Sequence, residues 1–251
     1  MEPPSGPLPT HKWGQATNLR LLKISKLTLQ LPHNTSILAC KVLAPELKAL
    51  GVPADLLHLL DQDLHRCPEQ LQKAISLNVE DLESHPGVKQ IIVAYGYCGG
   101  ALEGLKSQKA ALVVPLVHDC IPLLLGRTGR ASFIDQGNVF FLSPGWIEYG
   151  KTPYTEFFES QERFGYEDAL WVALEMLKSY REVVLIKTVA GLTSTHRNYA
   201  YAMANLFGLA YREIEGNEQL LLDLLSARSC PHICRLKPGE MLTSEHFHKH
   251  I

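Results

Sequence analysis

A short apolar run followed by a helical pattern recurs along this chain, and that alternation constrains the fold more than any other feature. The expected strands cover 37–39, 89–95, 111–115, 138–142, 181–188, 210–215 and 231–236. The expected helices cover 44–50, 68–82, 101–108, 120–125, 166–180, 197–207 and 219–226. Strands that alternate with helices form a mainly parallel sheet covered by helices. The sequence therefore predicts an α/β protein with two Rossmann-like halves.

The remaining stretches define the expected organisation. Residues 1–16 are rich in proline and glycine and are expected to be a flexible tail. Residues 17–251 are expected to form one α/β domain, in which the stretch 145–162 would divide two lobes. Alternating apolar positions in 21–32 fit an edge strand or extended arm, and 53–65 fits a second helix or helical loop. With 46% hydrophobic residues, the chain can bury a real core.

Charge and cysteine usage exclude some classes of function. The net charge is −2 without a long run of one sign, so we expect no nucleic-acid partner. The start of the chain lacks a signal-peptide pattern, and no apolar stretch reaches the roughly 18 residues of a membrane helix. A cytoplasmic location is expected, where thiols stay reduced. The six cysteines then point to metal binding, catalysis or burial.

Three of these cysteines follow apolar runs. Cys40, Cys98 and Cys120 each come just after a predicted strand, and His118 lies two residues before Cys120. Ligands of open α/β sheets bind outside the carboxyl ends of the strands, where three thiols could converge. Thiolate and imidazole are the ligands that zinc prefers. The alternative is that each cysteine is a small buried core residue.

Residues around the cysteines suggest a ligand pocket. Gly96 and Gly99 flank Cys98, and glycines let a backbone approach a ligand closely. Asp119 could orient His118 or cap the following helix. Trp146 follows the strand 138–142, and we expect it at the same sheet edge as the cysteines. There its ring could bind a methylated cation, although a core position explains it as well.

Several segments together resemble one known family. They are Ala39–Leu47, His65–Leu71, Tyr95–Gly100, Pro115–Gly126 and Leu142–Glu148. These segments resemble a prokaryotic domain-of-unknown-function family, number 1638, whose members are often encoded near corrinoid-dependent methyltransferases. The resemblance implies that the cysteines and His118 form a metal site. It adds His65 through a His-x-x-Pro motif, and it implies a corrinoid protein as a partner. The chain departs from the family pattern at Gly100, Leu116 and Pro122.

The expected function is a zinc–thiolate centre that acts on a small molecule in corrinoid-linked methyl transfer and one-carbon metabolism. Zinc lowers the pKa of a coordinating thiol, which prepares that thiol to accept a methyl group. We expect the three sulfurs within about 4 Å of one another and either His65 or His118 as a further ligand. The alternatives are an iron–sulfur enzyme with one open iron, and a non-enzymatic accessory or binding module with a structural metal.

Overall fold

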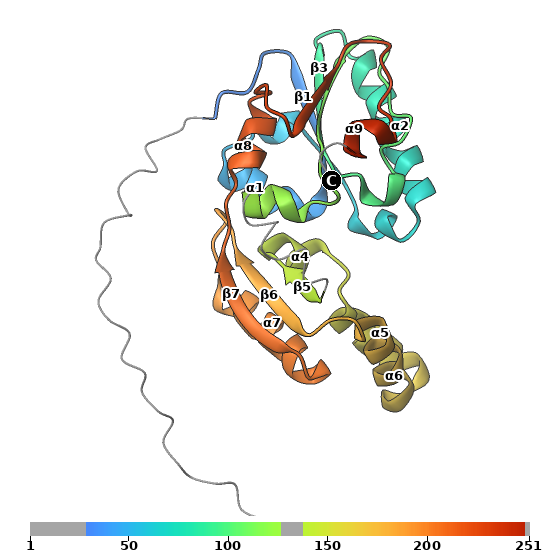
Figure 1. Ribbon diagram of the computed structural model, residues 1–251, viewed down its shortest axis with the longest axis vertical. Coiled ribbons are helices and arrows are strands. Elements are labelled where there is room, and N and C mark those ends of the chain that lie inside the picture. Colours follow the sequence, from blue (N-terminus) through green and yellow to red (C-terminus); the bar gives the residue numbers. More distant parts are fainter. Residues whose placement is uncertain (1–28, 127–137, 249–251) are drawn as a thin grey trace, which may run out of the picture.

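The computed structural model describes residues 29–126 and 138–248, which form two β-sheets with helices around them (Figure 1). The α/β class and the mainly parallel sheets that the sequence predicts are confirmed. The expected tail at 1–16, and most of the stretch 21–32, lie outside the described residues.

The first sheet has five strands in the order β2-β1-β3-β4-β8. These strands are β1 (Thr35–Cys40), β2 (Leu57–Leu60), β3 (Gln90–Ala94), β4 (Ala111–Pro115) and β8 (Ile233–Leu236). The first four run parallel, and β8 runs antiparallel to β4. Both β1 and β3 are buried along their whole length, as expected for central strands of a parallel sheet covered on both faces.

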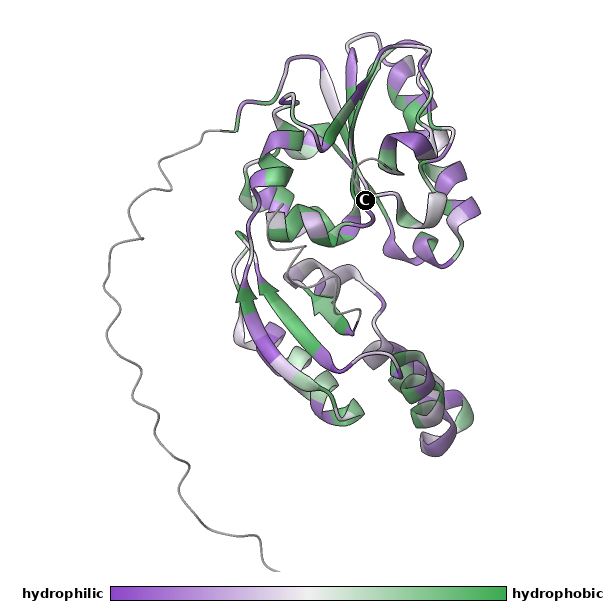
Figure 2. Ribbon diagram, viewed as in Figure 1, coloured by the Kyte–Doolittle hydropathy of each residue, from purple (hydrophilic) through white to green (hydrophobic). Residues whose placement is uncertain are grey.

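The second sheet has three parallel strands in the order β5-β6-β7. They are β5 (Val139–Leu142), β6 (Glu182–Lys187) and β7 (Ala210–Glu215). The central strand β6 is hydrophobic along most of its length (Figure 2). The outer strand β7 is nowhere fully buried, which fits its place at a sheet edge.

Helices cover both sheets. They are α1 (Ala44–Ala49), α2 (Pro68–Ser84), a helix over 121–126, α4 (Pro144–Tyr149), α5 (Pro153–Phe164), α6 (Tyr166–Leu177), α7 (Ser194–Phe207), α8 (Gln219–Leu225) and α9 (Ser244–His248). Short 3₁₀ helices are η1 (Lys41–Leu43), η2 (Ala54–Leu56), η3 (Gln62–Arg66) and η4 (Cys98–Gly100). In the first sheet α2 packs on β1 and β3, and α8 packs on β3 and β4; in the second, α7 packs on β6 and β7.

Two stretches that were expected to be helical differ in the structure. The stretch 53–65 contains the strand β2 between two 3₁₀ helices. The stretch 101–108 is not an α-helix, because Gly99, Gly100 and Gly104 all have positive φ and the chain turns there instead. The stretch 145–162, expected to divide two lobes, forms most of α4 and α5.

The two sheets are joined through close backbone and side-chain contacts. Gly145, in α4, lies so close to η1 that an added Cβ would stand 1.8 Å from the carbonyl oxygen of Val42. Thr188, just after β6, donates a hydrogen bond of 2.8 Å from its hydroxyl to Oε1 of the buried Glu46. Trp146 packs against the cores of both sheets. The second sheet is therefore fixed against the carboxyl-end side of the first.

Candidate functional site

The carboxyl ends of β1, β3 and β4 lie side by side in the first sheet. Ala39 pairs with Ala94 across β1 and β3, and Ile92 pairs with Val113 across β3 and β4. This register brings Cys40 at the end of β1 and the loops after β3 and β4 to one edge. The placement of the three cysteines at strand ends of one parallel sheet follows the pattern that the sequence predicts.

Tyr95 lies at this edge directly after β3, and the sequence patterns do not predict it as a site residue. Its side chain is buried, and its ring stacks on that of His65 with 5.9 Å between the ring centroids. The pKa of Tyr95 is raised mainly by burial, and charges on Cys40, Cys98 and Cys120 would raise it further. The three thiols and His65 thus surround one tyrosine, and we call these residues together with Trp146 the thiol cluster.

The thiols of the cluster are protonated at neutral pH. Burial raises the pKa of Cys40 to about 11 and that of Cys98 to about 12. The pKa of Cys120 is also raised, first by burial and then by the neighbouring Cys40, Asp119 and Cys98. Cys40 and Cys120 are buried, whereas Cys98 is only partly buried. The cluster is therefore reached most easily from the side of Cys98.

Two buried donors point to a missing acceptor in this region. Among the described residues, Tyr95 Oη and Trp146 Nε1 have no hydrogen-bond partner of good geometry. Tyr95 Oη is a close neighbour of the Cys40 thiol, and the Trp146 indole is a close neighbour of the Cys120 thiol. A neutral thiol is a weak acceptor, whereas a thiolate accepts strongly from N–H and O–H groups. Both donors would be satisfied if the neighbouring thiols ionised.

His65 is held by a hydrogen bond from one of its ring nitrogens. Its Nδ1 lies 3.0 Å from the carbonyl oxygen of Gln62, so Nδ1 donates and Nε2 keeps its lone pair. Burial lowers the pKa of His65, which keeps the ring neutral at pH 7. The side chain of Gln62 in turn accepts a hydrogen bond of 2.8 Å from the backbone of Lys151. The segment that carries His65 is thereby tied to the loop before α5.

His118 and Asp119 differ from His65 in their placement. The residue His118 is exposed. Asp119 accepts a hydrogen bond of 2.8 Å from the backbone of Ile121 and so caps the helix over 121–126, one of the two roles expected for it. The protein around its carboxyl raises the pKa of Asp119, and its charge acts on His65. Of the two candidate histidines, the geometry favours His65.

The glycine motif around Cys98 is explained by the crossing of two loops. An added Cβ at Gly96 would stand 2.5 Å from the backbone of Asp119. The backbone N–H of Cys98 donates to the carbonyl oxygen of His118 at 2.8 Å. The close approach expected at Gly96 is thus made to the loop after β4. Gly99 has a φ of +70°, and Cys98 itself has a φ of +46°, a conformation that costs energy for a residue with a side chain.

Trp146 reaches the cluster by a different route from the one expected. It was expected at the same sheet edge as the cysteines, but its strand β5 belongs to the second sheet. The tight contact between Gly145 and Val42 places α4 beside η1, and this brings the Trp146 indole to Cys120. A single sequence could not reveal that contact, because the strand order places β5 in a separate sheet.

The described residues do not form a complete metal-binding site in their present arrangement. In residues 29–126 and 138–248, no three His, Cys, Asp or Glu side chains are arranged to hold a metal ion. The expected separation of about 4 Å between the sulfurs therefore stays a prediction for a metal-loaded protein.

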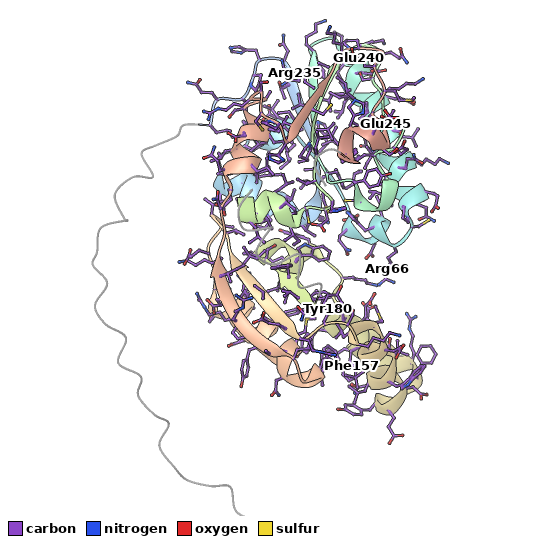
Figure 3. All side chains as sticks on the ribbon, in the orientation of Figure 1. Arg66, Phe157, Tyr180, Arg235, Glu240 and Glu245 are labelled. Carbon is purple, nitrogen blue, oxygen red and sulfur yellow. The ribbon has the colours of Figure 1, made fainter. Side chains whose placement is uncertain are left out.

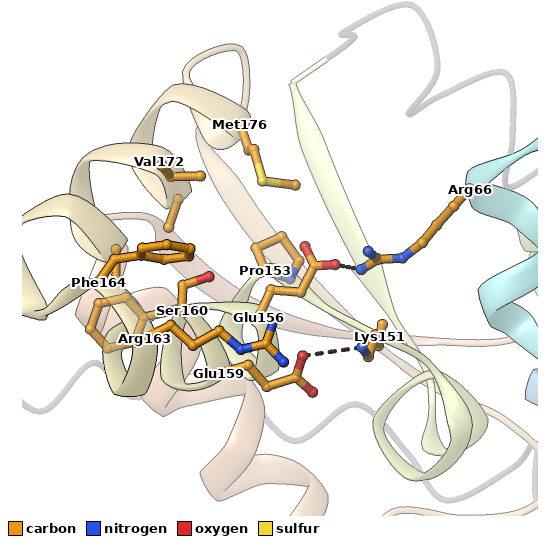
Figure 4. Close-up of a pocket in the computed structure, with 13 residues that line it drawn as sticks. Arg66, Lys151, Pro153, Glu156, Glu159, Ser160, Arg163, Phe164, Val172 and Met176 are labelled. Carbon is orange, nitrogen blue, oxygen red and sulfur yellow. Dashed lines mark hydrogen bonds and ion pairs between the residues drawn. The ribbon is translucent and has the colours of Figure 1, made fainter.

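A separate cavity of about 330 Å³ lies between η3 and the helices α5 and α6 (Figure 4). Arg66 reaches out of the first lobe toward these helices (Figure 3) and pairs there with Glu156. Lys151 pairs with Glu159 at 3.1 Å. Two basic side chains at this cavity are thus paired with acidic ones.

Residues 59–225 match the family described as protein of unknown function (DUF1638). The chain belongs to this family. The matched range contains every residue of the thiol cluster except Cys40, and it also contains His118. No curated protein and no solved structure matches the chain. Among the helices that the structure describes, none is both long and apolar enough to pass through a bilayer.

Proposed function

We propose that this member of the DUF1638 family is a zinc–thiolate protein that activates a thiol for methyl transfer. In this proposal Cys40, Cys98 and Cys120 bind the metal as thiolates, and His65 completes the site until a substrate thiol arrives. The observation that carries the proposal is the pair of buried donors, Tyr95 Oη and Trp146 Nε1, beside two of the thiols. Neutral thiols accept only weakly from these donors, whereas thiolates held by a metal would accept strongly.

The electrostatics of the cluster support a metal rather than free thiolates. With pKa values of about 11 and 12, Cys40 and Cys98 would not ionise near neutral pH by themselves. A bound cation supplies the charge that stabilises coordinating thiolates, and it displaces their protons. Zinc fits the donor set, because it takes sulfur and nitrogen ligands in a tetrahedral site. When bound, zinc would also lower the pKa of an incoming substrate thiol.

The residues around the metal would have distinct tasks. Tyr95 and Trp146 would donate hydrogen bonds to the thiolates of Cys40 and Cys120 and keep them oriented. The neutral His65, whose Nε2 carries the lone pair, could take the proton of the substrate thiol once that thiol displaces it. Partly buried Cys98 marks the side from which a small molecule would enter.

The methyl donor is the finer part of the proposal. The family resemblance favours a corrinoid protein as the methyl donor. Its methyl group would pass to the substrate sulfur, and the electron pair of the broken cobalt–carbon bond would stay on cobalt. Consumption of a methylated corrinoid by zinc-loaded protein and a thiol would support this step. A protein that binds zinc but leaves the corrinoid unchanged would favour the accessory or binding role.

The experiment that tests the metal site is metal analysis after anaerobic purification. We expect about one zinc per chain in the wild type and a loss of affinity of at least about tenfold in Cys40→Ser, Cys98→Ser or Cys120→Ser. Cys67→Ser is the matched control, because this thiol contacts Glu69 at 3.2 Å outside the cluster. Zinc binding should tighten as pH rises, because three high-pKa thiols must lose protons.

The histidines provide a second matched pair. His65→Ala should lower zinc content, whereas exposed His118→Ala should leave it unchanged. Full zinc occupancy in all three cysteine variants would overturn the proposal. A brown protein with broad visible absorbance would instead support the iron–sulfur alternative, for which three thiols would leave one iron open.

A further inference from the structure

The helical hairpin of α5 and α6 carries an unusual share of the apolar surface. Of thirteen large apolar side chains exposed among the described residues, seven lie in this hairpin. They are Phe158, Phe164, Tyr166, Trp171, Val172, Leu174 and Met176. Figure 1 shows the hairpin projecting away from both sheets. A surface helix normally presents polar residues to solvent, so a concentration of this kind marks an interaction surface.

One stripe along α6 has a repeating pattern. Glu167, Trp171, Leu174 and Lys178 follow one another at spacings of four, three and four residues, which places them on one face of the helix. All four are exposed. The stripe therefore starts with an acid, has two apolar residues in the middle and ends with a base.

This stripe is complementary to itself in the antiparallel direction. A two-fold axis that passes between residues 172 and 173 pairs position 167 with 178 and position 171 with 174. Glu167 would then face the partner's Lys178, and Trp171 would face the partner's Leu174. By symmetry each contact is made twice, as an interface of this type requires.

We propose that the protein forms a two-fold dimer through antiparallel packing of α6 against α6 of a second copy. Lys178 pairs with the nearby Glu175, but both side chains are exposed. Exposed ion pairs contribute little free energy, so Lys178 can leave Glu175 for an acidic partner on the second copy. Phe164 and Tyr166 lie at the turn between α5 and α6 and extend the apolar surface beyond the stripe. The twelve-residue helix is about 18 Å long, so the contact is small and the dimer should be concentration-dependent.

The test is sedimentation equilibrium of the full chain from about 1 to 100 μM, a range that brackets a micromolar dimer. Trp171→Glu should weaken dimerisation at least about tenfold, because a central aromatic anchor is lost. Trp171 is 68% exposed, so the folded monomer should tolerate this change. Leu77→Glu in α2 is the matched control, because Leu77 is also a large exposed apolar residue, and it should leave dimerisation unchanged.

Charge reversal tests the antiparallel register. Lys178→Glu alone should weaken the dimer about tenfold, since two attractive contacts become repulsive. The double variant Glu167→Lys with Lys178→Glu should restore wild-type association. A monomer throughout the concentration range would overturn the proposal. A dimer that is indifferent to Trp171→Glu, or that the double variant fails to restore, would also overturn it.

Discussion

Both sheets present the carboxyl ends of parallel strands at one edge, but the buried polar side chains at the two edges differ in their hydrogen bonding. At the second sheet, the hydroxyls of Ser143 and Thr193 accept hydrogen bonds from Trp146 and His196 and cap the following helices. Thr188 donates to Glu46. At the first sheet, Tyr95 Oη faces protonated thiols without a partner of good geometry among the described residues.

This difference separates a structural edge from a candidate functional edge. Buried polar groups in folded proteins almost always have partners, so a buried donor without one needs an explanation. At the second sheet each hydroxyl named above stabilises a helix end or the junction between lobes. At the first sheet, Tyr95 Oη and the Trp146 Nε1 that reaches this edge from α4 lie beside thiols that would become strong acceptors on losing a proton. The predictions below test that contrast.

The largest expected effect concerns the contact that joins the two sheets. Gly145→Ala would place a Cβ 1.8 Å from the carbonyl oxygen of Val42, so the backbone of α4 or η1 must move. We expect a loss of about 4 kcal/mol in the free energy of unfolding, at the upper end of overpacking effects. Gly87→Ala is the control, because an added Cβ there meets no atom within 4 Å. Urea unfolding measures both, and equal stability of the two variants would contradict the close junction.

The second prediction concerns Glu46 and the pH dependence of stability. The pKa of Glu46 is raised to about 7, mainly by burial; the hydrogen bond from Thr188 lowers it, and the nearby Glu218 and Glu148 contribute to the rise. Because the folded protein favours the protonated form, stability should fall as pH rises from about 4.5 to about 7. A pKa shift of this size lowers the free energy of unfolding by about 3 kcal/mol over this pH range.

Glu46→Gln removes this titration while it keeps an acceptor for Thr188. The difference in unfolding free energy between wild type and variant should change by about 3 kcal/mol between pH 4.5 and pH 8, in favour of the variant at high pH. The measurement is urea unfolding of both proteins across this range. A difference that does not vary with pH would show that Glu46 ionises as freely in the folded state as in the unfolded state.

The third prediction compares one hydroxyl from each edge. Thr188→Val leaves Glu46 Oε1 without its donor and should lower the free energy of unfolding by about 2 kcal/mol. Tyr95→Phe removes a hydroxyl that has no good partner and should leave the stability of metal-free protein within about 0.5 kcal/mol. The same Tyr95→Phe change should weaken zinc binding about tenfold, because a donor to a metal-bound thiolate is lost. Equal costs for the two substitutions in metal-free protein would remove the contrast between the edges.

Much of the fold could be predicted because apolar runs and helix boundaries are visible in the sequence. The strand over 210–215 and the helix that begins at Pro68 agree with the structure. The strand β2 was missed because Leu57–Leu60 is too short to show a period. The start of α5 is marked in the sequence by Thr152 as its cap and by Pro153 in its first turn.

The candidate site could be predicted only in part. The position of these cysteines after strands predicts that Cys40, Cys98 and Cys120 lie at one sheet edge, and this prediction needs no knowledge of the strand order. Tyr95 was missed, although it directly follows a buried strand at the same edge, and that position was the available signal. The contact of Trp146 with Cys120 depends on how one sheet is placed on another, and local patterns do not contain that information.

The most direct test of the central claim is X-ray absorption at the zinc edge of protein loaded with one equivalent of zinc under anaerobic conditions. The thiol cluster predicts three sulfur neighbours at about 2.3 Å and one nitrogen neighbour at about 2.0 Å. In Cys98→Ser the spectrum should show one sulfur fewer, and in Cys67→Ser it should be unchanged. A zinc ion surrounded only by nitrogen and oxygen, or a spectrum that Cys98→Ser does not alter, would contradict the account.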